Sequence, residues 1–292
     1  MSYCNSLLAE SPSSVEKVAD RVEETSTLPD VALHVIQVAN DGIAGAQELR
    51  AVLETDDALS ASVLRLVNSS DYGLRQRVTD LPMAVAYLGP QQIRNLVLTA
   101  CMSDVFKGED ELIGTYRRSN LWRHLVAVGV CSRLIAMRCG IENFEDAFLA
   151  GLTHDLGIIL EDQYLHAGFR RMLTSLDARV PLEDSERREF GFAHTELAAR
   201  VAERWGFPDL VIAAIRGHHG DERFSGEHLR AVRCVEVANM LCTLKGLSSV
   251  GANLLHPAVP AVNGLGLTKP DLEALLIDFD EELARHTALF AL

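Results

Sequence analysis

Apolar residues recur at three- and four-residue spacing along almost the whole chain, and no run of strict alternation marks a β-strand. Spacings of three and four residues place apolar side chains on one face of an α-helix, whereas alternation would place them on one face of a strand. The pattern therefore predicts an all-α fold. We expect consecutive helices packed into a two-lobed helical bundle.

Local signals indicate where several of these helices begin. Leu28-Pro29-Asp30 opens one helix, and residues 46–54 and 57–68 have amphipathic patterns. Thr268-Lys269-Pro270-Asp271 is typical of a capped helix start with proline in the first turn. It leads into an amphipathic segment, which predicts a last helix ending near Leu292.

One polar stretch suggests a boundary between two parts of the chain. Composition turns polar at Lys107-Gly108-Glu109-Asp110, and the histidines of chemical interest all follow it. We therefore divide the chain into an N-terminal helical subdomain, residues 1–108, and a C-terminal helical domain, residues 109–292. Because residues 11–14 are serine-rich and polar, we expect residues 1–25 to be partly loose.

Composition narrows the class of protein. The 292-residue chain is 48% hydrophobic, which is ample for a large core, and its formal net charge is −14. A negative field repels phosphate backbones, so we expect no nucleic-acid partner. No apolar run approaches the roughly 20 residues that span a bilayer, and residues 1–12 lack the order of a signal peptide. The composition predicts a cytoplasmic protein that does not bind membranes.

The segment Thr153-His154-Asp155-Leu156-Gly157 carries the sharpest chemical signal, and it follows an apolar stretch predicted to be helical. Adjacent His and Asp side chains at a helix end can reach one metal ion through nitrogen and oxygen. Gly157 lets the backbone turn closely around such a site. His-Asp pairs are also common on solvated surfaces, so this segment by itself does not establish a site.

Three other segments place histidines within helices or at their ends. His218 and His219 stand between glycines at the end of a helix that begins near Pro208. A polar helix terminus, where cationic groups are favourable, explains them as well as a metal site does. His194 begins an amphipathic helix. His124 lies in an apolar helical stretch, where a hydrogen-bonded core histidine is the simpler interpretation.

The order of these residues along the chain resembles the metal-binding series of the HD phosphohydrolase superfamily, to which the HD-GYP proteins belong. In that superfamily separate helices supply imidazoles and carboxylates to one or two metal ions. The resemblance implies that the metal ligands are His124, His154, Asp155, His194, His218 and His219.

Further motifs resemble the HD-related output domain (HDOD) family within that superfamily. They are Leu28-Pro29, residues 56–59 and 64–69, Tyr72-Gly73, Leu88-Gly89, residues 93–97, Trp122, residues 147–152, Glu189, residues 205–208 and His218-His219. The motifs extend over about residues 20–245. The resemblance implies a regulatory protein of bacterial signalling systems, generally without established enzymatic activity, whose C-terminal domain is HD-like.

The chain departs from its relatives in two directions. Members of the HDOD family frequently lose the His-Asp pair, whereas this chain keeps His154-Asp155. In cyclic-di-GMP phosphodiesterases of the superfamily a lysine follows the His-Asp-x-Gly element, where this chain has Ile158, which cannot neutralise a phosphate. Asn239 matches a later aspartate ligand, and its uncharged amide would be a weak ligand. We expect metal binding to survive and hydrolysis to be lost.

The expected ligand set favours a divalent transition metal, namely iron, manganese, nickel or zinc, over magnesium. Six ligands exceed what one tetrahedral zinc ion needs, so one ion and two ions both fit. Arg123 and Arg216 stand beside predicted ligands and are the candidates for phosphate binding. Glu196, Asp146 and Glu189 could orient imidazoles, although each is more simply a solvated helix residue.

Two functions remain open. The leading one is a bacterial signal-transduction protein that binds a metal, with a signalling protein or a small nucleotide as partner, and with no or vestigial hydrolase activity. The alternative is a metal-dependent phosphohydrolase or phosphodiesterase acting on a cyclic or ordinary nucleotide, in which the metal activates water. A cluster of arginine or lysine at the mouth of the site would favour the alternative.

Overall fold

The computed structural model describes residues 15–25, 28–38, 43–68, 76–108, 110–177, 179–220, 223–250, 257–285 and 287–290. Within these ranges the elements are α-helices, and the β pairing is confined to an isolated bridge between Ile113 and Tyr116. The all-α prediction is confirmed. No helix in the described part of the chain has the length and apolar character needed to cross a membrane.

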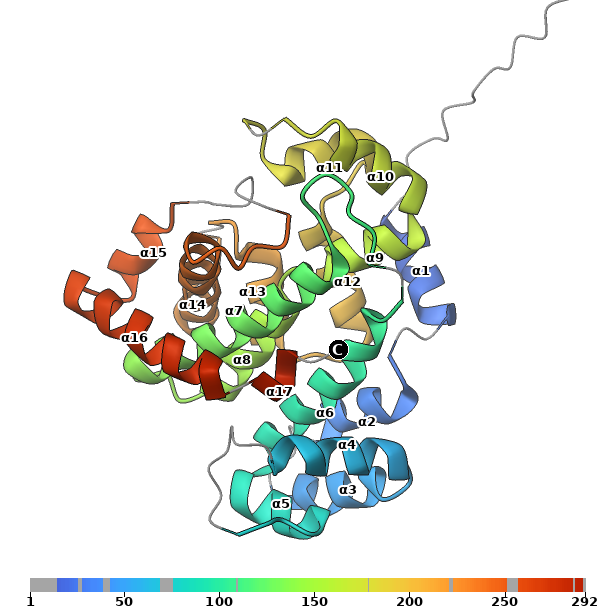
Figure 1. The fold of residues 1–292 in the computed structure, drawn as a ribbon, viewed down its shortest axis with the longest axis vertical. Coiled ribbons are helices and arrows are strands. Elements are labelled where there is room, and N and C mark those ends of the chain that lie inside the picture. The colour runs from blue at the N-terminus through green and yellow to red at the C-terminus, as the bar shows by residue number, and fades with distance from the viewer. Residues whose placement is uncertain are drawn as a thin grey trace, which may run out of the picture.

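Two lobes of helices lie one above the other along the long axis of the molecule (Figure 1). The N-terminal lobe comprises α2 (Asp30–Val38), α3 (Ile43–Leu53), α4 (Asp57–Val67), α5 (Leu81–Leu88) and α6 (Pro90–Val105). The C-terminal lobe comprises α7 (Arg118–Arg138), α8 (Phe144–Thr153), α9 (Leu156–Tyr164), α10 (His166–Thr174), α11 (Leu182–Phe190), α12 (His194–Arg204), α13 (Asp209–Gly217), α14 (Gly226–Leu244), α15 (Val259–Gly264), α16 (Lys269–Arg285) and α17 (Thr287–Phe290). Buried apolar side chains from both lobes form one continuous cluster.

Short-range hydrogen bonds account for the ends of the N-terminal helices. The side chain of Asp56 accepts a bond from the amide of Leu59 at 3.0 Å and caps the start of α4. The side chain of Asn68, at the end of α4, binds the backbone of Val78, ten residues further along the chain. It donates to the carbonyl of Val78 and accepts from its amide, both at 2.8 Å. The motif Tyr72-Gly73 lies outside the described residues.

The last long helix begins where the sequence predicts and ends earlier. Asp271 accepts hydrogen bonds from the amide and hydroxyl of Thr268, at 2.9 and 2.5 Å, and so caps α16. The helix ends at Arg285, so the predicted end near Leu292 is wrong. The short helix α17 instead packs against α7, where the Trp122 indole donates to the carbonyl of Leu289 at 3.1 Å.

The first helix, α1 (Val15–Thr25), packs on the C-terminal lobe against α12 and α9, although it precedes the N-terminal lobe in the chain (Figure 1). Its apolar residues Val18, Ala19 and Val22 are buried there. Residues 15–25 are thus helical, while residues 1–14 lie outside the described residues. The division of the chain near residue 108 remains a prediction.

A buried polar junction joins α6 of the N-terminal lobe to the start of α8. The Arg94 guanidinium, fully buried, donates to Asp146 at 2.7 Å. Asn95 donates to the Glu145 carboxylate at 2.8 Å and to the Glu145 carbonyl at 2.9 Å. Since α8 ends next to His154 and Asp155, this junction positions the helix that leads into the candidate site.

Candidate metal centre

Four helix ends and one helix interior bring the predicted ligands to one place. His154 and Asp155 occupy the turn between α8 and α9, His194 is the first residue of α12, and His218 and His219 follow α13. His124 lies within α7, which packs along α8 and α14. The six predicted ligands come from separate segments, and five of them are fully or almost fully buried.

Gly157 makes the close approach of α9 to α12 possible. A Cβ atom at this position would lie 2.1 Å from the carbonyl oxygen of His194 and 2.8 Å from its Cα. Both contacts are with backbone, so no side-chain rearrangement could make room for a larger residue. The glycine that follows the His-Asp pair is therefore required by packing, and this packing sets His194 beside Asp155.

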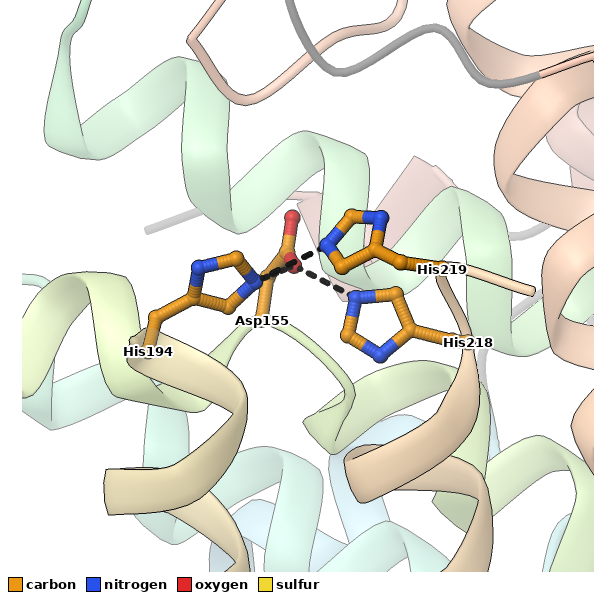
Figure 2. Close-up of side chains that lie close together, drawn as sticks. All are labelled: Asp155, His194, His218 and His219. Atoms are coloured by element: carbon orange, nitrogen blue, oxygen red, sulfur yellow. Dashed lines mark hydrogen bonds and ion pairs between the residues drawn. The ribbon is translucent and has the colours of Figure 1, made fainter. Parts of the chain in front are cut away.

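Asp155 lies between two groups of imidazoles. Its Oδ1 is 3.3 Å from His194 Nε2 and 3.2 Å from His218 Nε2 (Figure 2). His219 joins this group, because its Nε2 is 3.1 Å from His194 Nε2. The ligand atoms of these four residues all lie within 4.8 Å of one another. The first group therefore surrounds a space that one metal ion could occupy.

The second group lies on the other carboxylate oxygen. Asp155 Oδ2 is 3.3 Å from His154 Nε2 and 3.7 Å from His124 Nε2, and the two imidazole nitrogens are 3.3 Å apart. The hydroxyl of Ser249 donates to the same oxygen at 3.1 Å. With one oxygen directed to each group, Asp155 could bridge two ions.

The outer nitrogen of each of four rings is engaged in a hydrogen bond. His124 Nδ1 donates to the carbonyl of Leu247 at 2.7 Å, and His154 Nδ1 donates to that of Gly151 at 2.7 Å. His218 Nδ1 donates to the carbonyl of Ile215 at 2.9 Å. A carbonyl only accepts, so the proton of each neutral ring stays on Nδ1 and the lone pair of Nε2 faces the cluster.

Glu186 does the same for the fourth ring. Its carboxylate oxygens lie 2.7 and 2.9 Å from His194 Nδ1, and one of them also accepts from the His194 amide at 2.9 Å. Burial opposes protonation of His194, but the charge of Glu186, the hydrogen bonds to Glu186 and the charge of Asp155 raise its pKa well above the usual value. Glu186 therefore fixes both the backbone and the ring of His194.

A second buried carboxyl lies beside Glu186. Glu161 is fully buried on α9, and burial, followed by the charge of Glu186, raises its pKa well above the ordinary value. Burial and the neighbouring carboxylate therefore favour the neutral form of the Glu161 carboxyl.

The protonation states of His124 and Asp155 suit metal binding. Burial, with the neighbouring His154, lowers the pKa of His124 to about 4. Burial opposes ionisation of Asp155, yet the surrounding His154, His194 and His218 lower its pKa well below the usual value. A neutral imidazole and an ionised carboxylate are the forms that bind a metal, so His124 and Asp155 need not lose a proton at neutral pH, whereas the raised pKa of His194 opposes metal binding at its Nε2.

The donor set fits a divalent transition metal. Two buried atoms, Asp155 Oδ1 and His218 Nε2, have no hydrogen-bond partner among the described residues, although both point into the first group. Buried polar atoms are nearly always hydrogen-bonded, so unsatisfied ones facing each other call for a bound species. Imidazole nitrogens with one carboxylate favour iron, manganese, nickel or zinc.

The two arginines proposed for phosphate binding lie in different surroundings. Arg123 is exposed on α7, next to the buried His124. Arg216 pairs with Glu203 at 2.6 Å and lines an open pocket of about 630 Å³ that also has His219 in its wall. Of these two arginines, only Arg216 lines a pocket whose wall also includes a histidine of the cluster.

Two further residues concern the missing hydrolytic groups. Ile158 is fully buried in the core, so nothing at this position faces the pocket. Asn239 is buried on α14, and its side-chain oxygen accepts a hydrogen bond from the Thr243 hydroxyl at 3.4 Å. Its role as a weak ligand remains a prediction.

Other residues than the three carboxylates considered for this role support the imidazoles. Each of these three carboxylates pairs with an arginine: Glu196 with Arg187, Asp146 with Arg94 and Glu189 with Arg171. The carboxylate that orients an imidazole is Glu186, and the hydroxyl that supports Asp155 is that of Ser249. Neither has a helical spacing to its partner, so periodicity offered no signal for them.

Comparisons with known proteins agree with this fold. The family model described as HDOD domain matches residues 26–220. A solved HDOD domain protein of unknown function from Geobacter sulfurreducens is 27% identical, with a TM-score of 0.75, over 94% of this chain and 96% of the other.

More distant structures show the fold alone. A protein of Marinobacter aquaeolei VT8, provisionally named a signal transduction protein, is 24% identical, with a TM-score of 0.73, over 94% of this chain and 63% of the other. A protein of Shewanella amazonensis SB2B, provisionally named a phosphohydrolase, is 21% identical, with a TM-score of 0.70, over 95% of this chain and 97% of the other.

One curated relative is a longer protein. An uncharacterized protein of Treponema pallidum (strain Nichols) is 25% identical over 225 residues, which are 76% of this chain and 43% of the relative. The chain therefore spans less than half the length of that relative.

Proposed function

Since the chain belongs to the HDOD domain family, we propose that it is a regulatory protein of bacterial signalling that holds one or two divalent transition-metal ions without turning over a substrate. The family and the fold are the premise. The metal and the regulatory role are the proposal, and a signalling protein or a small nucleotide is the partner we expect.

The hydrogen bonds made by Nδ1 of four imidazole rings are the observation that carries the proposal. Hydrogen bonds to three carbonyls and one carboxylate hold Nδ1 of His124, His154, His194 and His218, and the Nε2 atoms face Asp155. Core histidines that only filled space would not need all four rings turned the same way. Metal-ligating histidines usually have this outer hydrogen bond, because it orients the ring and raises its basicity.

The residues would divide between two positions. His194, His218 and His219 would hold an ion at Asp155 Oδ1, and His124 and His154 would hold one at Asp155 Oδ2. The first ion would tie α12 and the end of α13 to Asp155, and the second would tie α7 and the end of α8 to the same residue. Their presence would then stabilise one arrangement of these helices, which is what a regulatory element requires.

Removal of the metal is expected to lower the melting temperature. An ion that binds the folded chain stabilises it by mass action, by about 2.7 kcal/mol at a hundredfold excess over Kd. For a chain of this size, that amounts to a loss of roughly 5 °C or more on chelation. Differential scanning calorimetry with and without chelator, and elemental analysis of the purified protein, measure the two quantities.

The control separates the cluster from ordinary histidines. The double variant His154→Ala with Asp155→Ala should lose both the metal and the sensitivity to chelator. His228→Ala, an exposed position on α14, should keep both. The proposal fails if protein grown in metal-supplemented medium carries no stoichiometric transition metal and shows no thermal shift with iron, manganese, nickel or zinc.

A metal-dependent phosphohydrolase is the second candidate, and one observation favours it. Arginines line the pocket that His219 borders, as an enzyme acting on phosphates would require. In such an enzyme the metal would supply an activated water. Against this candidate, Ile158 is buried at the position where active relatives carry a lysine.

We expect no hydrolysis of a cyclic dinucleotide above the level of a chelator-treated control, because the chain has Ile158 and Asn239 in place of a lysine and an aspartate. Chromatography of cyclic-di-GMP incubated with metal-loaded protein measures the linear product. Metal-dependent product formation that disappears in His154→Ala would replace the regulatory proposal with the enzymatic one.

A further inference from the structure

We propose that the pocket beside His219 binds a small phosphorylated molecule through arginines that converge from several segments. The inference deepens the proposed function, because the pocket shares His219 with the candidate metal centre. For the wall of this pocket, α11 supplies Arg187, α12 supplies Arg200 and α13 supplies Arg216. Arg223, just before α14, is a fourth.

Basic residues outnumber acidic ones in the wall of this pocket. The chain as a whole has 41 acidic residues against 27 basic ones, whereas four arginines line the pocket with two carboxylates, Glu183 and Glu196. The planar fork of arginine matches the oxygens of a phosphate, and several forks from different directions suit a group with oxygens on all sides. A carboxylate ligand would engage fewer of them.

The arginines already hold anionic groups, and those contacts are exposed. Arg187 pairs with Glu196 at 3.1 Å, and both side chains are 46% exposed. Arg216 pairs with Glu203 at 2.6 Å, with side-chain exposures of 42% and 32%. Exposed ion pairs are weak and easily exchanged. A phosphate could therefore take over these guanidinium groups without breaking a buried interaction.

Helix α1 supplies one more carboxylate to these arginines. Glu16 lies 2.6 Å from Arg200, and the neighbouring Val15 lines the pocket. Arg200 also pairs with Glu203 at 2.9 Å. Glu16 and Glu203 thus hold Arg200 and Arg216, and a ligand would compete with them for these guanidinium groups.

The size and the position of the pocket indicate what kind of molecule fits. Its volume of about 630 Å³ is that of a site for a small organic ligand. His219 forms part of its wall, and the Nε2 of the same ring faces His194 in the cluster. A phosphate in the pocket would therefore lie beside a bound cation, which would attract it further.

Isothermal titration of metal-loaded protein with inorganic pyrophosphate tests the proposal. We expect saturable binding to the wild type and about tenfold weaker binding by Arg187→Gln and by Arg216→Gln, since each loses a charge-assisted hydrogen bond. The matched control is Arg285→Gln, an exposed arginine of α16 paired with Glu281 and Glu282, which should bind within about twofold of wild type. Glu16→Gln should bind about threefold more tightly, because it removes one of the two carboxylates that pair with Arg200.

Three results would overturn the proposal: no saturable binding to wild type, unchanged binding by both pocket variants, or weaker binding by Glu16→Gln. Circular dichroism of each variant confirms that the fold is retained. Elemental analysis of the same samples tests the metal separately. Pyrophosphate binding that needs Arg187 and Arg216 in a protein free of metal would support this pocket and defeat the proposed metal centre.

Discussion

Replacing Gly157 with alanine is expected to destabilise the protein by about 3 kcal/mol or more and to weaken metal binding. The new methyl group would lie 2.1 Å from the carbonyl oxygen of His194 and 2.7 Å from its carbonyl carbon. Because both neighbours are backbone atoms, α9 and α12 would have to separate. That separation would move His194 away from Asp155, so one substitution outside the ligand set would affect fold and site together.

The matched control is a second buried helix glycine. At Gly129, in α7, an added Cβ would meet the Phe148 carbonyl oxygen at 3.1 Å and the Leu152 amide at 3.3 Å, which small shifts can relieve. Alanine also favours a helix by about 1 kcal/mol over glycine, so Gly129→Ala should change stability by only about 1 kcal/mol in either direction. Urea unfolding measures both. Equal stability of Gly157→Ala and wild type would contradict the close packing of α9 on α12.

Replacing Arg94 with methionine is expected to cost about 3 to 5 kcal/mol, the usual result of removing one partner of a buried ion pair. Arg94 is fully buried, and its guanidinium donates to Asp146 at 2.7 Å and to Asn95 at 3.2 Å. Without it, Asp146 loses its cationic partner at the contact between α6 and α8. The free energy of unfolding, from urea titration monitored by circular dichroism, gives the measurement.

Two further variants show whether the loss comes from the unpaired charge. Arg50→Met removes an exposed arginine that pairs with Glu54 at 2.7 Å, and should change stability by about 0.5 kcal/mol or less. Adding Asp146→Leu to Arg94→Met should restore part of the stability, because an apolar pair replaces a lone carboxylate. An Arg94→Met protein as stable as Arg50→Met would show that the junction does not hold the lobes together.

The junction also bears on the proposed regulation. Arg94 and Asn95 hold the first turn of α8, while the last residue of α8 directly precedes His154 and Asp155. A shift of α8 would therefore change both its contact with α6 and the position of His154 and Asp155. Ligand binding in the C-terminal lobe and the packing of the N-terminal lobe could be coupled through it, provided that α8 moves as a rigid element.

Features set by neighbouring residues were predictable from the sequence alone. The 3.6-residue periodicity is a property of each segment, so the all-α class follows from it. The helix starts at Asp30 and Lys269 follow from proline and capping side chains a few residues apart. The set of candidate ligands came from their order along the chain and its resemblance to a known family. None of these inferences required knowledge of which helices touch.

Tertiary packing decided the rest, because it joins residues far apart in the chain. Periodicity gives the buried face of a helix but not the partner of that face, so the docking of α1 on α12 was not predictable. For the same reason Glu186, and not Glu196 or Glu189, supports His194. Arg123 directly precedes His124 and Arg216 stands two residues before His218, yet only the fold turns Arg216 toward the pocket that His219 lines. A neighbour in the sequence becomes a neighbour in the site only when its helix is rotated to face it.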